Sequence, residues 1–202
     1  MKVDRPVSEL LELLRARSVF HGNFTLASGG TSKYYVDCKL TTLDARGAWL
    51  TGEAMHALIR REEAMRNVKI DSLGGLTMGS DPIALAVAMY SFQQAEQPPL
   101  RMFSVRKAPK AHGQTKLIEG NFKSGDTTVI IDDVVTRGES TIAAINAVVN
   151  EGGKIAFIAV LVDREEGGRA KIESMGYPVV SLFRREQVFA VQSKEKEPAS
   201  VT

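Results

Sequence analysis

The 202-residue chain has a single cysteine, Cys38. One thiol cannot form a disulfide framework or a thiolate zinc site within one chain, so the sequence favours a reducing compartment, and we expect a cytoplasmic protein. No uninterrupted apolar run approaches the roughly 18 residues that a membrane-spanning helix needs. The N-terminal residues interleave charged with apolar side chains, which does not fit an export signal. We therefore expect no membrane association.

A strong charge of one sign is also missing. The chain has 26 Lys and Arg against 24 Asp and Glu, and a net charge of +2 is too small for wholesale binding to nucleic acid. With 44% hydrophobic residues, the chain can bury one sizeable core, so we expect a single domain over residues 1–192. Residues 193–202 are rich in Lys, Glu and Pro and are expected to be disordered.

Helical and strand-like segments alternate along the chain. Helical periodicity and start signals predict helices at four places: Leu10 to Leu14 after Pro6 and Ser8, 44–65 with Asp44 as N-cap, a helix after Asp81 with Pro82 at its first position, and 140–150 ending at Gly152. Short β-branched apolar runs predict buried strands at 102–105, 128–134, 155–162 and 179–183. This alternation predicts an α/β fold, a Rossmann-like, mostly parallel sheet flanked by helices, with ligands at the carboxyl ends of the strands.

The most informative segment is a strand that ends in two acidic residues. Ile130 and Ile131 precede Asp132 and Asp133, and a hydroxyl-rich turn with glycine then leads into a helix. Backbone N–H groups at a helix start, with hydroxyls around them, hold a phosphate, whereas two carboxylates need sugar hydroxyls or a metal ion. A phosphorylated sugar meets both needs. The alternative is a capped helix whose aspartates only satisfy turn amides.

Residues 129–141 resemble the phosphoribosyl pyrophosphate signature of the type I phosphoribosyltransferases. The resemblance implies that Asp132 and Asp133 are catalytic residues that meet the ribose hydroxyls and a magnesium-bound substrate. It also implies that the whole segment binds phosphoribosyl pyrophosphate, with the 5-phosphate on its second half: Asp132, Asp133, Val134, Val135, Thr136, Arg137, Gly138, Glu139 and Ser140. Arg137 and Glu139 stand where small residues are more usual in that family.

Basic side chains are concentrated in one loop. Arg106, Lys107, Lys110 and His112 fall within seven residues after a predicted strand. Cations that close over a leaving pyrophosphate only in the reacting complex stabilise the transition state preferentially. A solvated basic loop is the alternative for a cluster of this composition.

The spacing in this loop, Arg-Lys-x-x-Lys-x-His-Gly, is similar to the mobile catalytic loop of the orotate phosphoribosyltransferases. The resemblance implies that Arg106, Lys107, Lys110 and His112 bind the pyrophosphate, with Arg106 and Lys110 as the catalytic cations. In that family the loop is usually donated across a dimer interface. A homodimer with shared active sites is therefore implied.

Two further segments fit the same family. Residues 22–36 look like its N-terminal segment, in which Tyr35 and Val36 hold the positions whose backbone meets the planar base. Judged alone, this segment fits any β-hairpin with a glycine turn. A second glycine-rich turn precedes Thr77 and Met78, which the resemblance puts in the pyrophosphate-side loop. A turn that only connects a strand to a helix is the alternative.

An arginine follows the predicted strand 155–162 closely. A guanidinium pairs with a planar carboxylate through two parallel N–H bonds, and orotate differs from uracil by such a carboxylate. The resemblance puts Arg164 on the substrate base, with Thr136 near it as well. The alternative is a surface ion pair between Arg164 and Asp163 or Glu166.

The matched segments occur in the expected order between about Phe20 and Arg169. They imply a type I phosphoribosyltransferase fold with a small N-terminal hood over the base, residues 1–40, and a core, residues 41–192. The implied reaction joins orotate to the ribose 5-phosphate of phosphoribosyl pyrophosphate, with Mg²⁺ as cofactor, in the synthesis of UMP. A fused decarboxylase, present in some lineages, is not expected because little length remains after residue 185.

Two rival functions remain open. A phosphoribosyltransferase for another nucleobase, such as a purine, would not need a carboxylate clamp at Arg164. A non-catalytic regulator that senses phosphoribosyl pyrophosphate and binds nucleic acid would want a concentrated basic face, which the balanced charge does not indicate.

Overall fold

The computed structural model describes residues 5–25, 31–95, 98–108 and 116–190. A two-stranded antiparallel sheet pairs β1 (Val19–Thr25) with β2 (Thr31–Val36). A six-stranded sheet has the order β5-β4-β3-β6-β7-β8, and only the β4–β5 pairing is antiparallel. Its strands are β3 (Ser72–Leu76), β4 (Arg101–Val105), β5 (Ile118–Gly120), β6 (Thr127–Val135), β7 (Lys154–Asp163) and β8 (Val179–Arg184). The prediction of a mostly parallel α/β sheet is confirmed.

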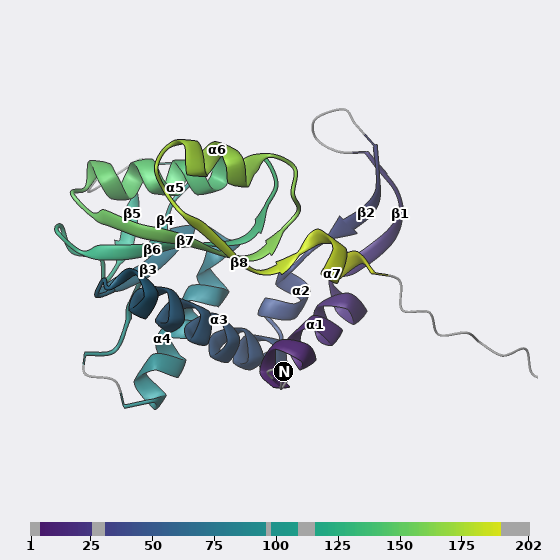
Figure 1. Cartoon of the computed structure of the whole chain (residues 1–202), viewed down its shortest axis with the longest axis horizontal. Helices are drawn as coiled ribbons and strands as arrows, with labels where there is room; N and C mark the ends of the chain where they lie inside the picture. Colours follow the sequence, from purple (N-terminus) through teal and green to yellow (C-terminus); the bar gives the residue numbers. More distant parts are fainter. Residues whose placement is uncertain (1–4, 26–30, 96–97, 109–115, 191–202) are drawn as a thin grey trace, which may run out of the picture.

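Helices cover both faces of the large sheet. Figure 1 shows α5 and α6 on one face, and α3 and α4 on the other, with α1 beyond them. The helices are α1 (Arg5–Arg17), α2 (Lys39–Thr42), α3 (Ala45–Arg66), α4 (Ser80–Gln93), α5 (Glu139–Asn150), α6 (Gly168–Ser174) and α7 (Arg185–Phe189). In the described part of the chain, no helix combines the length and apolar character needed to cross a membrane.

The central strands are apolar on both sides because each side faces a layer of helices. Along β6, Val129 and Ile131 belong to the core cluster under α3 and α4, whereas Ile130 belongs to the cluster under α5. This alternation follows from the two-residue period of a strand. Burial of each such side chain stabilises the fold by about 1.5–3 kcal/mol, which explains why these strands were predictable from composition alone.

The helix starts agree with the sequence only in part. Asp44 is the N-cap of α3 as predicted, and its carboxylate accepts a hydrogen bond from Gly47 N at 3.0 Å. The predicted start of α4 was wrong, because the helix begins at Ser80 and Pro82 occupies its third position. Proline is tolerated there because the N–H groups of a first helical turn have no partner within the helix. Likewise, α1 begins at Arg5, before Pro6.

The predicted hood contains two different kinds of structure. Leu10 and Leu14 of α1 are fully buried in the same cluster as Met55 and Ile59 of α3, so the N-terminal helix packs as part of the main core. The β1–β2 hairpin instead extends away from the large sheet (Figure 1). The predicted tail, residues 193–202, lies outside the described residues.

Candidate functional site

The strand order creates a switch point at the carboxyl ends of β3 and β6, and we call the space outside this switch point the crevice. From β3 the chain passes through α4 to β4 on one side, whereas from β6 it passes through α5 to β7 on the other. Ligands of open α/β sheets bind where such neighbouring connections diverge. The loop after β3 contacts the end of β6, since a Cβ atom built on Gly79 would lie 2.5 Å from Asp133 Oδ1. A side chain at position 79 would therefore displace the Asp133 carboxylate.

Asp132 is oriented by the helix that follows it. Its Oδ2 accepts hydrogen bonds from the Ser140 hydroxyl at 2.9 Å and the Thr141 hydroxyl at 2.6 Å, and its Oδ1 accepts one from Asp133 N at 3.1 Å. Burial raises the pKa of Asp132 to about 6, although the hydroxyl bonds act in the opposite direction. Both hydroxyls were expected to donate to a phosphate. In the structure each gives its one proton to Asp132.

Asp133 interacts electrostatically with Lys39, a residue outside the motifs predicted from the sequence. Burial raises the pKa of Asp133, and the positive charge of Lys39 opposes this effect. The Lys39 ammonium donates to Asp37 Oδ1 at 2.6 Å. This hydrogen bond raises the pKa of Lys39, with smaller contributions from Asp133 and Tyr35. The end of the hairpin and the acidic pair thus interact electrostatically. The sequence signal was an Asp-x-Lys pattern directly after β2.

Tyr35 and Val36, the two residues expected to meet the planar base of the substrate, lie at the end of β2. The Tyr35 side chain is half exposed, and its ring centroid lies 6.2 Å from that of Phe20 and 5.6 Å from that of Phe24. Val36 is buried and belongs to the main core. The hairpin therefore presents an aromatic face to solvent next to a residue that anchors it to the core.

The turn from β6 to α5 depends on Gly138. This residue caps the helix with φ at +80°, a conformation that glycine adopts without steric cost. Thr136 is half-buried, and Arg137 and Glu139 are exposed. The first N–H groups of α5 follow directly, and the positive end of a helix dipole favours an anion at such a position.

Arg164 is buried and incompletely satisfied. Its Nη2 lies 2.7 Å from Glu166 Oε1, so the ion pair proposed as the alternative is present. The guanidinium is not on the surface, however, because Arg164 is only 9% exposed and its buried Nε has no hydrogen-bond partner. An unmet buried donor costs about 1–3 kcal/mol. One N–H of Arg164 is thus left for an acceptor that the described residues do not supply.

The turn that carries Arg164 is tied to the turn after β6. Arg164 N donates to Val135 O at 3.0 Å, and Gly168 N donates to Thr136 O at 2.8 Å. The second contact is so close that a Cβ atom on Gly168 would lie 2.5 Å from Thr136 O and 2.7 Å from Gly138 N. The two candidate binding segments therefore form one rigid unit, which we call the paired turns.

Asp163 fixes the base of the Arg164 turn. Its Oδ1 accepts a hydrogen bond from Glu165 N at 2.8 Å, and its Oδ2 accepts one from Arg169 Nη1 at 3.2 Å. Asp163 is 1% exposed, so these two bonds satisfy a carboxylate that has little access to water. The sequence predicted Asp163 only as a possible partner of Arg164, and it gave no signal for Arg169, because the contact between Asp163 and Arg169 is made by folding.

The glycine-rich turn was predicted too early in the chain, because Gly74 and Gly75 lie within β3 and the turn itself is formed by residues 77–79. Side chains of α4 and β4 hold this turn at Thr77. The Thr77 hydroxyl donates to Asp81 Oδ2 at 2.6 Å, and Asp81 Oδ1 accepts from the Ser104 hydroxyl at 2.6 Å. Thr77 N donates to Val105 O at 2.8 Å. Met78 is 58% exposed. The turn is therefore anchored on its Thr77 side and open on its Met78 side.

The basic loop is described only at its start. Arg106 follows β4, and its Nε donates to Ala108 O at 3.2 Å while its Nη1 lies 3.7 Å from Glu119 Oε1. Lys107 is exposed. Lys110 and His112 lie outside the described residues.

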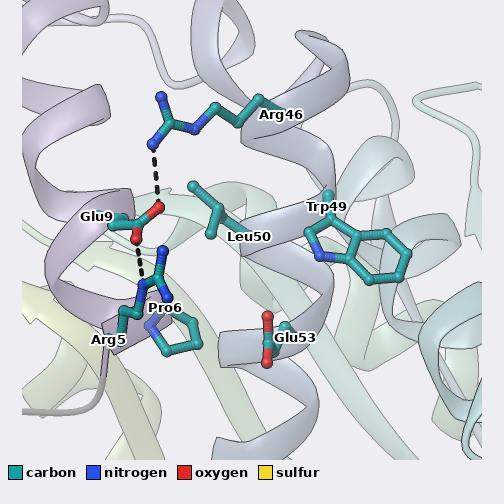
Figure 2. A pocket seen from close by; sticks show the side chains of 7 residues that line it. All are labelled: Arg5, Pro6, Glu9, Arg46, Trp49, Leu50 and Glu53. Atoms are coloured by element: carbon teal, nitrogen blue, oxygen red, sulfur yellow. Dashed lines mark hydrogen bonds and ion pairs between the residues drawn. The ribbon is translucent and has the colours of Figure 1, made fainter.

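Two hollows lie outside the crevice, and the second adjoins it at Met78. The first, about 400 Å³, lies between α1 and α3 (Figure 2) and is lined by Arg5, Pro6, Glu9, Arg46, Trp49, Leu50 and Glu53. Glu9 pairs with Arg5 of the same helix at 2.7 Å and with Arg46 of α3 at 3.0 Å, and none of the candidate residues lines this hollow. The second, about 490 Å³, is an apolar groove lined by Thr42, Leu43, Ala48, Met78, Asp81, Pro82, Leu85, Ala86, Met89 and Met102.

Comparisons with known proteins extend over most of the chain. No protein-family model matches it. It is 40% identical over 179 residues to the orotate phosphoribosyltransferase of Aquifex aeolicus, covering 87% of this chain and 93% of that protein. The solved Mycobacterium tuberculosis orotate phosphoribosyltransferase in complex with Fe(III) dicitrate has a TM-score of 0.76 at 36% identity, covering 91% and 99% of the two chains. The Mycobacterium tuberculosis enzyme in complex with phosphoribosyl pyrophosphate has a TM-score of 0.72 at 33% identity, covering 91% and 98%.

Proposed function

The chain belongs to the orotate phosphoribosyltransferase family, and from this premise we propose that the crevice between β3 and β6 binds both substrates. The protein is a pentosyltransferase that joins orotate to the ribose 5-phosphate of phosphoribosyl pyrophosphate, forming orotidine 5′-phosphate and pyrophosphate. We assign this step to the synthesis of UMP. The observation that carries the site assignment is Asp132, a buried carboxylate oriented by Ser140 and Thr141 at the start of α5.

Phosphoribosyl pyrophosphate is assigned to the turns after β3 and β6. Asp132 and Asp133 accept hydrogen bonds from the ribose hydroxyls, and the turn 136–140 holds the 5-phosphate with backbone N–H groups at the positive end of α5. The turn at Thr77 and Met78 lies on the pyrophosphate side. The contact between Gly79 and Asp133 supports this assignment, because it puts the pyrophosphate-side turn beside the ribose carboxylates.

Orotate is assigned to the space between the hairpin and the Arg164 turn. The Arg164 guanidinium pairs with the orotate carboxylate, Thr136 lies near it, and the backbone of Tyr35 and Val36 meets the planar ring. The unmet Nε of Arg164 supports this assignment, since a carboxylate would satisfy it. A base without a carboxylate would leave the same donor unmet, which disfavours the other nucleobases.

The chemistry needs no covalent nucleophile. As the glycosidic bond to pyrophosphate breaks, positive charge develops on the ribose ring and negative charge grows on the leaving group. The acidic pair faces the ring, and Arg106, Lys107, Lys110 and His112 close over the pyrophosphate. Their effect is greatest in the transition state because the leaving-group charge is largest there.

We assign Mg²⁺ as the cofactor, held mainly by substrate oxygens. In the described parts of the chain, no three or more His, Cys, Asp and Glu side chains gather to hold a metal ion. Asp132 and Asp133 fit the alternative arrangement, in which Mg²⁺ is bound by one or two carboxylates together with substrate phosphates. When bound, the cation would neutralise charge on the pyrophosphate.

The experiment that tests the function is an absorbance assay. Orotate is mixed with the protein, Mg²⁺ and phosphoribosyl pyrophosphate, with parallel reactions that contain uracil, hypoxanthine or adenine. We expect magnesium-dependent consumption of orotate alone. Turnover of another base would reassign Arg164, and no turnover of any base would favour a sensor of phosphoribosyl pyrophosphate.

Lys110→Ala should lower kcat far more than it weakens orotate binding, by about 10²-fold or more, because a loop cation acts mainly on developing charge. Steady-state kinetics and equilibrium binding of orotate measure the two effects separately. The matched control is Lys116→Ala, which removes the same charge beyond the loop and should change kcat little. Equal losses of turnover and binding, or no loss, would remove Lys110 from this role.

We propose a homodimer formed through the apolar groove along α4, which is also lined by the α2–α3 junction and by Met102 of β4. Leu43, Met78, Leu85 and Met89, which line the groove, are each at least 50% exposed, and a patch of this kind marks a protein contact. A second copy is the favoured occupant because the groove begins at Met78, beside the crevice. We assign the sharing of the basic loop between subunits to this dimer.

Met89→Glu should convert the protein into a monomer, because it places a charge in this apolar contact. Sedimentation velocity measures the change. Met65→Glu is the control, since Met65 is 72% exposed on α3 and does not line the groove. A monomeric wild-type protein, or a Met89→Glu dimer, would contradict the proposed interface.

We propose a cytoplasmic location. Its support is the single cysteine, because Cys38 is a buried free thiol and the chain depends on no disulfide within itself. Burial raises the pKa of Cys38 well above its usual value, which keeps the thiol protonated and unreactive.

A further inference from the structure

Glu166 is an acidic residue at the substrate arginine that the proposed function does not use. Its carboxylate lies 2.7 Å from Arg164 Nη2, on the guanidinium assigned to the carboxylate of orotate. Two carboxylates on one buried guanidinium repel each other, and one positive charge cannot neutralise both. Glu166 and a bound carboxylate ligand therefore compete.

The hydrogen-bond geometry favours exchange of one carboxylate for the other. Nε and Nη2 of an arginine form one edge that offers two parallel N–H groups to a single carboxylate. Glu166 pairs with Nη2, while the buried Nε has no partner. A planar carboxylate that takes both groups satisfies the unmet donor, and it needs the Nη2 that Glu166 holds.

Glu166 can leave without disturbing the turn. Its side chain is 34% exposed, whereas that of Arg164 is 11% exposed, so a released Glu166 carboxylate can be hydrated and Arg164 cannot. The base of the turn stays fixed, because Asp163 holds Glu165 N and Arg169. The exchange thus requires only rotation of one side chain.

We propose that Glu166 is a resident competitor for the carboxylate subsite: it neutralises buried Arg164 in the free enzyme and is displaced by the carboxylate of orotate. The inference rests on the proposed function, specifically on the assignment of Arg164 to orotate. Glu166 thereby weakens orotate binding in two ways. It stabilises the free enzyme, and it repels the bound ligand.

The test is Glu166→Gln, which keeps the shape of the side chain and removes its charge. We expect the Kd and KM for orotate to fall about two- to fivefold, the range for a partly exposed ion pair of up to about 1 kcal/mol. The kcat and the KM for phosphoribosyl pyrophosphate should not change, because the exchange takes place before the chemical step. Glu166→Ala should also lower the Kd for orotate.

Glu165→Gln is the matched control, since it removes the same charge one residue earlier and Glu165 forms no ion pair with Arg164 in the described structure. An unchanged or higher orotate Kd in Glu166→Gln would overturn the proposal and make Glu166 an orienting partner of Arg164. An equal fall in Glu165→Gln would overturn it in favour of a general charge effect. If the unsubstituted protein does not turn over orotate, the proposed function fails, and this inference fails with it.

Discussion

Asp132→Asn should lower turnover by about 10²- to 10³-fold and at the same time stabilise the substrate-free protein. Asp132 is 5% exposed, and burial raises its pKa from 3.8 to about 6, so the native fold disfavours its ionised form. This difference corresponds to up to about 3 kcal/mol of lost stability at pH 7. Asparagine carries no charge and avoids this cost.

The hydrogen bonds around Asp132 can accommodate asparagine. Its carbonyl oxygen can accept from Asp133 N, and its amide group can donate to the hydroxyls of Ser140 and Thr141 once these rotate. Turnover should nevertheless fall by about 10²- to 10³-fold, because a charge aimed at the reacting ring is lost. Asp132 is therefore a residue that activity requires although it lowers the stability of the fold.

The pH dependence of this effect has a definite sign. A carboxyl group whose pKa is raised by folding binds more protons in the native than in the unfolded state between pH 3.8 and about 6. The cost of Asp132 is therefore fully present above about pH 6 and disappears as the pH falls toward 4. The Tm values of Asp132→Asn and of the wild type should differ most at pH 7 and converge near pH 4.

Asp133→Asn is the control for the stability measurement. Burial raises the pKa of Asp133 as well, but the substitution also removes a favourable interaction with Lys39. Its gain in stability should therefore be smaller. A Tm of Asp132→Asn at or below that of the wild type at pH 7 would show that ionised Asp132 does not destabilise the fold.

Gly168→Ala should also cause a large loss of activity. A methyl group at this position would lie 2.5 Å from Thr136 O and 2.7 Å from Gly138 N, and backbone atoms cannot move aside as a flexible side chain can. The paired turns must therefore separate. A misplacement of about 1 Å at a reacting centre costs about 10² in rate, and we expect the KM for both substrates to rise as well.

The control for this variant is Gly176→Ala. Gly176 has φ at +90°, so alanine is strained there by about 1 kcal/mol, but a Cβ atom meets nothing within 4 Å. It should lower the Tm slightly and leave kinetics unchanged. Near-normal kinetics of Gly168→Ala would mean that the two turns act independently.

The sequence predicted those elements that are stabilised by their own composition. The bounds of β6 and β7 were right to within one residue at each end, because both strands are rich in β-branched apolar residues and have charged residues at their limits, Asp126 before β6 and Asp163 at the end of β7. β5 was missed, since a three-residue strand is held by pairing with β4 rather than by its own residues. The start of α4 was missed because Pro82 is compatible with several positions in a first turn.

The candidate site was predictable where its functional residues lie close together in the sequence. The acidic pair, its helix start and Arg164 are short motifs with a local meaning. Lys39 and Arg169 were not found, because each acts on a residue of another element. The hydroxyl protons of Ser140 and Thr141 could not be assigned from sequence, since a hydroxyl near both a carboxylate and a phosphate site can donate to either.

The paired turns make the distance between two anion sites a fixed property of the fold. The turn after β6 receives a phosphate in our assignment, the Arg164 turn receives a carboxylate, and the bond from Gly168 N to Thr136 O joins them at 2.8 Å. Neither site can adjust its position without the other. The two turns therefore fix the distance between the phosphate site and the carboxylate site. A nucleotide fits when its own phosphate and carboxylate are separated by that distance.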